Sequence, residues 1–332
     1  MNPAPLVPPG DPLVVGTSGM PVLYSTLGAY FQLESLTPED VEVLEAVNGL
    51  VKDWFGEELR WTGTSVFHNV RPFAPDDLEL ISCHALQLAR GSPVAGAPPD
   101  VLLTYAQEDA ARIDEFEVAM HGGPESGSPW PYAYRFYAII PEFKPQAHFS
   151  SAAMLRITVP DRWPLDDFLR RVSAIAATLR LRWGAAGFMY SGWEYYQYNT
   201  TQRAVYAHAR RFPGYDTGYY DRPMLEWHGA LRTVNWLTFL GPELAAALKA
   251  RGSPLRSTPR VQVVPAGANV MLRAGETPER GDTNRLYLPR AYVEADEMIR
   301  PVRARSCLNF GRPWTEQSTQ DWLQRFEKRL RP

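Results

Sequence analysis

Apolar and polar positions near the start of the chain follow two different periods, which predict a strand, a helix and a second strand. The run from Val22 to Leu33 is rich in β-branched and aromatic residues, which favour strands. It is followed by Thr37-Pro38, a helix-start signal in which Thr37 caps the helix and Pro38 takes its first position. Apolar residues then recur at helical spacing up to Phe55, and Leu59–Phe67 is typical of a strand.

The same order of elements recurs about 126 residues later. Ala152–Val159 is typical of a strand, Pro164 opens a helix whose apolar positions continue to Leu179, and Ala185–Tyr190 is typical of a further strand. We interpret the two units as an internal duplication. The alternative is that so common a pattern occurs twice by chance.

Strands are also predicted between the two units, and helices after them. These strands are Val101–Tyr105, Ile113–Met120 and Tyr132–Ile140, and the helices are Gln202–Arg211, Pro242–Ala250 and Thr319–Leu330. The pattern indicates an α+β fold: an antiparallel-rich mixed sheet with helices packed on one face, arranged as two similar lobes if the duplication is real. We divide the chain into a proline-rich strap (1–20), an acidic first lobe (21–150) and a second lobe (151–332), which together form one continuous unit.

Composition excludes several classes of protein. The chain has 332 residues, 45% of them hydrophobic, which is enough for a large core. The sequence contains neither a signal-peptide pattern nor about 18 consecutive apolar residues, so we expect a cytoplasmic protein without a membrane partner. The two cysteines, Cys83 and Cys307, are far apart and lack metal-ligand spacing, so we expect both to be reduced.

The sequence offers little catalytic chemistry. It contains no complete nucleophile elbow and no phosphate-binding glycine loop, and its six histidines show no metal-ligand spacing. We therefore predict no catalytic residues, no metal and no cofactor. The remaining enzyme hypothesis is a base at His228, oriented by Asp221 or Glu226.

Charge is distributed very unevenly along the chain. The formal net charge is −3, but residues 1–150 carry 7 Lys and Arg against 20 Asp and Glu, whereas residues 151–332 carry 27 against 17. The acidic half indicates a basic protein partner rather than nucleic acid. The basic residues near the C-terminus, including Arg303 and Arg325, are interpreted as a solvated face.

Motifs in the second half resemble a bacterial family. Arg211-Phe212-Pro213-Gly214-Tyr215-Asp216 is followed by Val234-Asn235-Trp236-Leu237-Thr238-Phe239-Leu240-Gly241, and later by Gly281-Asp282 and a closing Trp322-Leu323-Gln324-Arg325-Phe326. Together these are similar to the type VI secretion immunity family associated with VRR-Nuc nuclease toxins. The resemblance covers about residues 151–330 well and the first half weakly. Its motif residues suit turns and core positions, so they do not mark a binding surface.

The resemblance implies an immunity protein that binds a cognate basic toxin domain, a nuclease, and neutralises it stoichiometrically. Combined with the charge distribution, it places the candidate contacts in the acidic half: Asp76, Asp77, Glu79, Asp114, Glu115 and Glu117, with Tyr105 and Phe116 as aromatic anchors. The alternatives are an interaction module unrelated to toxins and a homodimer in which acidic and basic halves meet.

Overall fold

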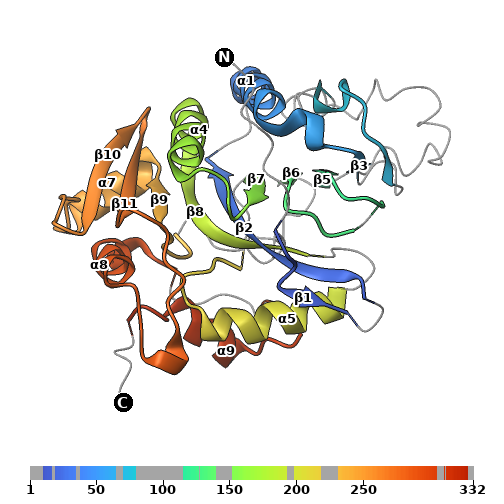
Figure 1. Cartoon of the computed structure of the whole chain (residues 1–332). Coiled ribbons are helices and arrows are strands. Elements are labelled where there is room, and N and C mark those ends of the chain that lie inside the picture. Colours follow the sequence, from blue (N-terminus) through green and yellow to red (C-terminus); the bar gives the residue numbers. More distant parts are fainter. Residues whose placement is uncertain are drawn as a thin grey trace.

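A single antiparallel sheet organises the chain in the computed structural model (Figure 1). The structure describes residues 10–16, 19–34, 38–64, 70–79, 115–126, 128–139, 152–192, 198–217, 231–304, 310 and 312–327. Ten strands follow the order β10-β11-β9-β8-β2-β7-β6-β5-β3-β4, and β1 pairs with β2 beside this path. Every named strand pair in this part of the chain is antiparallel.

The strands are β1 (Val14–Val15), β2 (Pro21–Leu33), β3 (Trp61–Thr64), β4 (Val70–Pro72), β5 (Glu115–His121), β6 (Ala133–Ile139), β7 (Ala152–Pro160), β8 (Leu181–Gly192), β9 (Leu237–Leu240), β10 (Val261–Ala266) and β11 (Asn269–Ala274). The α-helices are α1 (Pro38–Phe55), α4 (Leu165–Thr178), α5 (Tyr198–Arg211), α7 (Pro242–Ala250), α8 (Arg290–Ile299) and α9 (Glu316–Leu323). Short 3-10 turns are η1 (Gly56–Glu58), η4 (Thr283–Arg285) and η5 (Arg300–Val302).

Strand β2 is the centre of the sheet. It pairs with β7 on one side and with β8 along almost its whole length on the other. All its residues from Val22 to Leu33 are buried, so the strand is covered on both faces. A strand of this kind needs a layer of helices on each side of the sheet.

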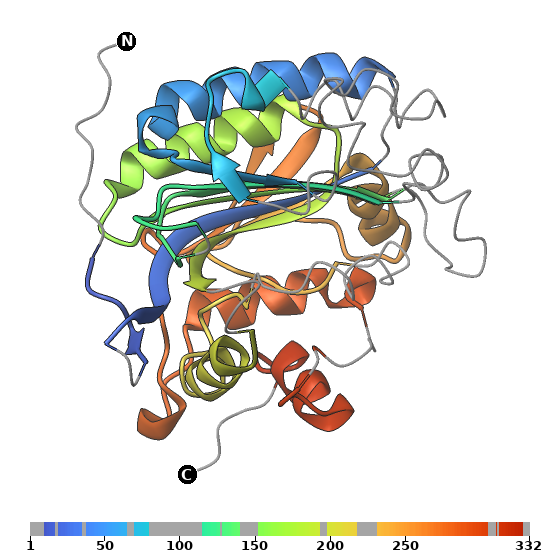
Figure 2. The ribbon, with the colours of Figure 1, turned by 90° about the vertical axis from the view of Figure 1, so that its right-hand side faces the viewer.

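Helices supply both layers. Helices α1 and α4 lie side by side on one face, and α5, α8 and α9 lie across the other (Figure 2). The predicted α+β class with an antiparallel-rich sheet is confirmed. The helices are not restricted to one face, however, because β2 and β8 bury side chains on both sides.

Several elements begin and end close to the residues that the sequence predicted. Helix α1 has the predicted bounds, β2 extends the predicted strand by one residue, and α4 follows the predicted Pro164. The two strand-helix-strand units place their helices together, but their strands are spaced differently: three strands separate β2 from β3, whereas only β2 lies between β7 and β8. Duplication therefore stays a prediction. The predicted strand Val101–Tyr105 lies outside the described residues.

The side chain of Asn269 anchors the β10–β11 hairpin to the turn between α4 and β8. Its amide nitrogen donates to the carbonyl oxygens of Ala176 at 2.7 Å and Leu179 at 2.8 Å, and its oxygen accepts from the Leu181 nitrogen at 3.2 Å. Asn269 is buried, so removing its amide would leave backbone groups without partners inside the protein.

We predict that Asn269→Ala lowers the free energy of unfolding by about 3 kcal/mol, because several buried backbone groups lose their hydrogen bonds. Urea unfolding followed by circular dichroism measures this loss. Asn284→Ala is the matched control, because Asn284 is exposed and its substitution should change stability by less than about 0.5 kcal/mol. Equal effects of the two substitutions would contradict the anchoring role.

Candidate functional site

The outer face of α1 is acidic. Leu44, Val47, Val51 and Trp54 recur at helical spacing and are buried against the sheet and α4. The opposite face exposes the carboxylates of Glu42, Glu45 and Asp53, and Glu57 is exposed in the turn η1 that follows α1; none of these forms an ion pair within the described residues. Glu57 belongs to the consecutive acidic pair Glu57-Glu58, whereas Glu42, Glu45 and Asp53 are separated in the sequence. A search for consecutive acidic residues misses these three, although the helical period could have found them.

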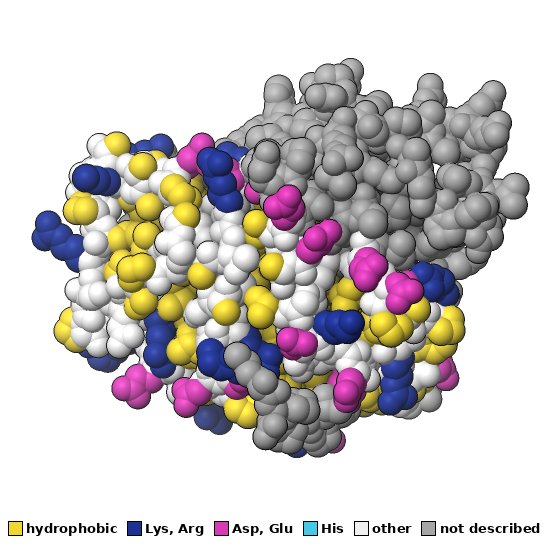
Figure 3. Space-filling model, turned by 90° about the horizontal axis from the view of Figure 1, so that it is seen from above, with side chains coloured by type: hydrophobic (Ala, Val, Ile, Leu, Met, Phe, Trp, Pro, Cys, Tyr) yellow, Lys and Arg dark blue, Asp and Glu magenta, His cyan; other side chains and the backbone are white. Residues whose placement is uncertain are grey.

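A turn beside α1 adds two of the predicted contacts. The amide of Asn48 on α1 donates to the Leu78 carbonyl oxygen at 2.9 Å, which holds the turn against the helix. Asp76 and Glu79 in this turn are exposed. We define the acidic surface as Glu42, Glu45, Asp53, Glu57, Asp76 and Glu79. Figure 3, viewed from above with respect to Figure 1, shows acidic side chains gathered on this side of the molecule.

Asp77 has an internal role, which corrects its prediction as a partner contact. Its side chain is 2% exposed. One carboxylate oxygen accepts from the Thr62 hydroxyl at 2.8 Å and from the Ala74 nitrogen at 2.8 Å, and the other pairs with Arg71. Asp77 therefore fixes the turn that presents Asp76 and Glu79, and its charge is directed inward.

The other predicted contacts are not located by the described side chains. Tyr105 and Asp114 lie outside the described residues. Glu115, Phe116 and Glu117 form the start of β5, but their side chains also lie outside the described part of the structure. These five positions stay predictions.

The enzyme hypothesis and a metal site were also considered. His228, Asp221 and Glu226, the residues of the enzyme hypothesis, lie outside the described residues. Within the described part of the chain, no group of three or more His, Cys, Asp or Glu side chains could hold a metal ion. No described helix is both long enough and apolar enough to cross a membrane.

The Phe-Pro-Gly-Tyr-Asp motif forms a turn after α5 that packs against residues 279–281. The Gly214 nitrogen donates to the Arg280 carbonyl oxygen at 2.8 Å, and a side chain at position 214 would collide with the Glu279 carbonyl oxygen. The Tyr215 ring stacks on Tyr190 with centroids 4.8 Å apart. The motif forms the turn that its structural interpretation predicted, and it also needs glycine for close backbone approach.

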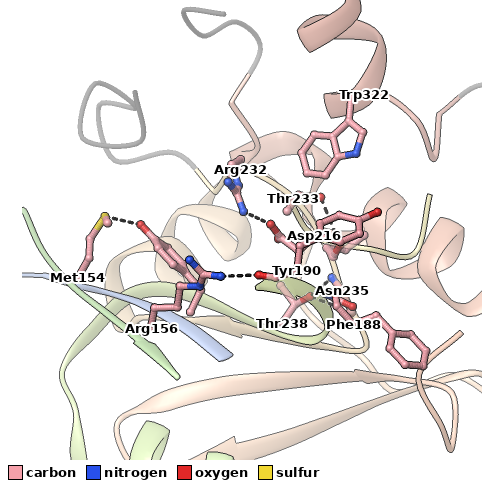
Figure 4. Close-up of polar contacts among 12 residues, drawn as sticks. Met154, Arg156, Phe188, Tyr190, Asp216, Arg232, Thr233, Asn235, Thr238 and Trp322 are labelled. Carbon is pink, nitrogen blue, oxygen red and sulfur yellow. Dashed lines mark hydrogen bonds and ion pairs between the residues drawn. The ribbon is translucent and has the colours of Figure 1, made fainter. Parts of the chain in front are cut away.

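Asp216 and Arg232 form a buried ion pair on the face of the sheet opposite α1 (Figure 4). Both side chains are 0% exposed. The Arg232 guanidinium also lies 5.7 Å from the ring centroids of Tyr30, Trp183 and Trp322, which come from β2, β8 and α9. The pair therefore joins the motif turn to the sheet and to the C-terminal helix.

Two arginines near the C-terminus are buried, which corrects their interpretation as part of a solvated face. Arg303 pairs with Asp296 and Glu327. Arg325 donates to the carbonyl oxygens of Pro213 at 2.6 Å and Val234 at 3.3 Å, and burial lowers its pKa to about 9. The closing motif is thus part of the same buried layer as the Phe-Pro-Gly-Tyr turn.

Comparison with protein families identifies the class. The family model described as "Type VI immunity for VRR-NUC" (TsiV) matches residues 113–326, well over half of the chain. The chain therefore belongs to this family of type VI immunity proteins, as the sequence motifs predicted.

A solved structure shows the same fold. The Pseudomonas aeruginosa T6SS protein PA0821 superposes with a TM-score of 0.70 over 94% of this chain and 85% of that chain, at 17% sequence identity. At this identity the likeness supports the fold alone. A search of curated proteins finds no match.

We predict that Arg232→Met alone destabilises the protein by about 3–5 kcal/mol, because it leaves the Asp216 carboxylate buried without its charge partner. The double variant Asp216→Leu/Arg232→Met should recover much of that loss, because apolar side chains can replace a buried ion pair. Urea unfolding of wild type, both single variants and the double variant measures the coupling. A double variant that shows the summed loss of the two singles would refute it.

The stability of the protein should depend on pH through two partly buried histidines. Burial lowers the pKa of His121 to about 4, and burial together with Arg280 and Arg211 lowers that of His208 to about 4. In the unfolded chain the pKa of histidine is about 6.5, so the unfolded chain takes up protons at these two histidines before the folded chain does. The stability gained from keeping both histidines neutral is therefore present above about pH 6.5 and is lost as the pH falls toward about 4.

The urea midpoint should therefore fall between about pH 7 and about pH 5.5, where ordinary carboxylates stay ionised. His208→Gln keeps a possible hydrogen-bond acceptor for the Tyr190 hydroxyl, which lies 2.8 Å from His208 Nδ1, and removes one titrating group. This variant should show a shallower pH dependence than wild type. An unchanged slope would rule out the contribution assigned to His208.

Proposed function

We propose that this chain is an immunity protein that binds a cognate secreted toxin, a nuclease, and neutralises it by stoichiometric contact. Membership of a family described as immunity to VRR-NUC carries the proposal. Binding occludes the toxin's active site or the path of its substrate. Neutralisation of this kind requires no catalytic step in the immunity protein.

The acidic surface is the proposed contact. A nuclease holds phosphates with Lys and Arg side chains, so its working surface is positively charged. The exposed carboxylates of α1 and of the neighbouring turn would attract that surface and occupy the groups that otherwise hold nucleic acid. Asp76 and Glu79 keep their place in this proposal, and the carboxylates of Glu42, Glu45 and Asp53 on α1 and of Glu57 in η1 join them.

Charged groups at the rim of an interface mainly set the association rate, so tight binding also needs an apolar anchor. Leu50 lies on α1 among the exposed carboxylates and is itself 36% exposed. We assign it to the centre of the contact. Tyr105 and Phe116 remain proposed anchors in the acidic half of the sequence.

The test is a charge reversal with a matched control. We predict that Glu45→Lys/Asp53→Lys/Asp76→Lys slows association with the toxin by about 10- to 100-fold at low salt, because electrostatic steering is reversed. The difference should shrink at high salt, where the charges are screened. Surface plasmon resonance with the purified cognate toxin measures both rates, and protection of cells that express the toxin is the functional readout.

The control variant is Glu276→Lys/Glu297→Lys/Glu316→Lys, which makes the same charge change at exposed positions in the second half of the chain. It should affect association much less. Leu50→Ala should instead speed dissociation. Equal effects of the two triple variants would overturn the surface assignment, and a wild-type chain that fails to bind the toxin would overturn the proposed function.

Sedimentation of the chain alone addresses the homodimer alternative. If acidic and basic halves of two copies meet, self-association should be strong at low salt and weak at high salt. Such behaviour without toxin binding would favour the alternative. A monomer at both salt concentrations that binds toxin would favour the immunity function.

A further inference from the structure

A short loop next to α5 exposes two large apolar side chains. The loop comprises residues 282–287 and includes η4, and we call it the tip loop. The Asp282 nitrogen donates to the Tyr287 carbonyl oxygen at 2.9 Å, and the Tyr287 nitrogen donates to the Asp282 carbonyl oxygen at 2.9 Å, so the loop is closed at its base. Leu286 is 53% exposed and Tyr287 is 46% exposed. Folding of the chain therefore leaves much of both side chains in water.

The backbone of Leu286 is strained. Its φ is 55°, in the left-handed region, and it is the one residue other than glycine with a positive φ among those that the structure describes. A non-glycine residue in this conformation costs about 1–2 kcal/mol, whereas glycine and asparagine adopt it more readily. Neither the strain nor the exposed apolar area stabilises the single chain. Strain of this kind is concentrated at binding sites, which points to a partner for the tip loop.

Hydrogen bonds and an ion pair fix the tip loop against α5. The Asp282 carboxylate accepts from the Asn284 nitrogen at 3.0 Å and pairs with Arg211 at 3.3 Å. The Thr283 hydroxyl donates to the Arg210 carbonyl oxygen at 3.2 Å. A loop held in this way loses little conformational entropy when a partner binds it. The tip loop is thus preorganised for contact.

The charge around the tip loop is mainly positive. Arg285 lies within the loop with its side chain 83% exposed, and Arg210 and Arg211 lie beside it at the end of α5. Within the described residues, the carboxylates that contact the loop are Asp282, which pairs with Arg211 and Arg285, and Glu279, which accepts a hydrogen bond from the loop's tyrosine. Three positive groups thus outnumber two negative ones. Together with the two apolar side chains, this charge fits a partner surface that is acidic around an apolar residue.

The acidic surface has the complementary chemistry. Its carboxylates on α1 lie around Leu50, which is 36% exposed. In Figures 1 and 2, α1 lies above the sheet and the tip loop, in orange, lies at the bottom of the molecule. The tip loop therefore cannot reach the acidic surface of its own chain, whereas it can reach that of a second copy.

We propose that the tip loop of one chain docks on the acidic surface of a second copy. Leu286 and Tyr287 contact Leu50, and Arg285 lies among the carboxylates around it. The contact is heterologous, because it joins different surfaces of the two copies, and it can therefore continue to further copies. It is also small, so it is weak. The toxin uses the same acidic surface in the proposed function, on which this regulatory step rests, so docking of a second copy keeps the surface covered until the toxin displaces it.

Sedimentation velocity of the full chain tests the docking. At about 25 mM salt, assemblies should grow as the protein concentration is raised from about 10 µM to about 1 mM, and at about 500 mM salt they should dissociate because the charges are screened. A wild-type chain that stays monomeric at low salt would overturn the proposal. If such a monomer floats with phosphatidylglycerol vesicles, the tip loop binds lipid instead.

A tip-loop variant and a matched control locate the contact. Arg285→Gln/Leu286→Asn removes one charge and the strained apolar side chain, and asparagine tolerates the left-handed conformation, so the fold should persist. Self-association should weaken by at least about 10-fold. The control is Val15→Asn/Arg256→Gln, because Val15 is 52% exposed and Arg256 is also exposed, both away from the tip loop in the sequence. Equal effects of the two variants would contradict the role of the tip loop.

Mixing two variants tests the head-to-tail geometry. The tip-loop variant keeps its acidic surface, and Glu45→Lys/Asp53→Lys keeps its tip loop. Each should be monomeric alone under conditions in which wild type assembles. An equimolar mixture should form a dimer with one copy of each variant and no larger species, because a single intact pair of surfaces remains. A mixture that stays monomeric would refute the contact between these two surfaces.

Addition of toxin separates the regulatory step from the proposed function. Purified cognate toxin should dissociate wild-type assemblies into complexes that contain one chain each, and the tip-loop variant should bind toxin as tightly as the wild-type monomer does. Assemblies that take up toxin without dissociating would show that toxin and second copy use different surfaces, and would overturn the regulatory step. Failure of the toxin to bind any form would overturn the proposed function alone, because sedimentation and mixing decide the docking without toxin.

Discussion

The Asp216–Arg232 ion pair holds together the layer of α5, α8 and α9, which lies below the sheet in Figure 2 and is called the lower layer here. Both charges are wholly buried, and the loss of water around them is compensated by their mutual attraction and by three aromatic rings around the guanidinium. Those rings come from β2, β8 and α9. If the lower layer shifted, Arg232 would lose several of these partners at once, so a single geometry of sheet, turn and C-terminal helix is favoured.

This constraint explains why the family motifs lie far from the acidic surface. The Phe-Pro-Gly-Tyr-Asp turn places Asp216 against β8, where its nitrogen donates to the Phe188 carbonyl oxygen at 2.8 Å. Arg325 then joins the closing helix to the same turn through the Pro213 carbonyl oxygen. The motifs therefore specify how the lower layer packs on the sheet. The surface on α1 can change its charges without disturbing that packing, because the sheet lies between them.

Much of the local structure was predictable from the sequence, and the side-chain partners were not. Proline, helical spacing and β-branched runs located α1, α4 and β2, since these signals are local. Asp77 was misassigned because its partners Thr62 and Arg71 lie on β3 and β4, and no sequence pattern indicates that they meet the turn of Asp77. The motif resemblance identified the family, but it carried no information about which carboxylates are exposed. The helical period of Glu42, Glu45 and Asp53 did carry that information.

The two halves of the chain also differ in whether their charged side chains are buried or exposed. In the basic half, the side chains of Arg156, Arg232, Arg303 and Arg325 are buried, so part of its positive charge is used to hold the interior together. In the acidic half, Glu42, Glu45 and Asp53 on α1 are exposed and lack ion pairs within the described residues. Buried aspartates such as Asp216 and Asp296 pair with two of these arginines, so burial removes both signs of charge from the surface. The field around α1 is acidic because its exposed carboxylates have no such ion pairs within the described residues, and a partner with a basic surface would recognise this property.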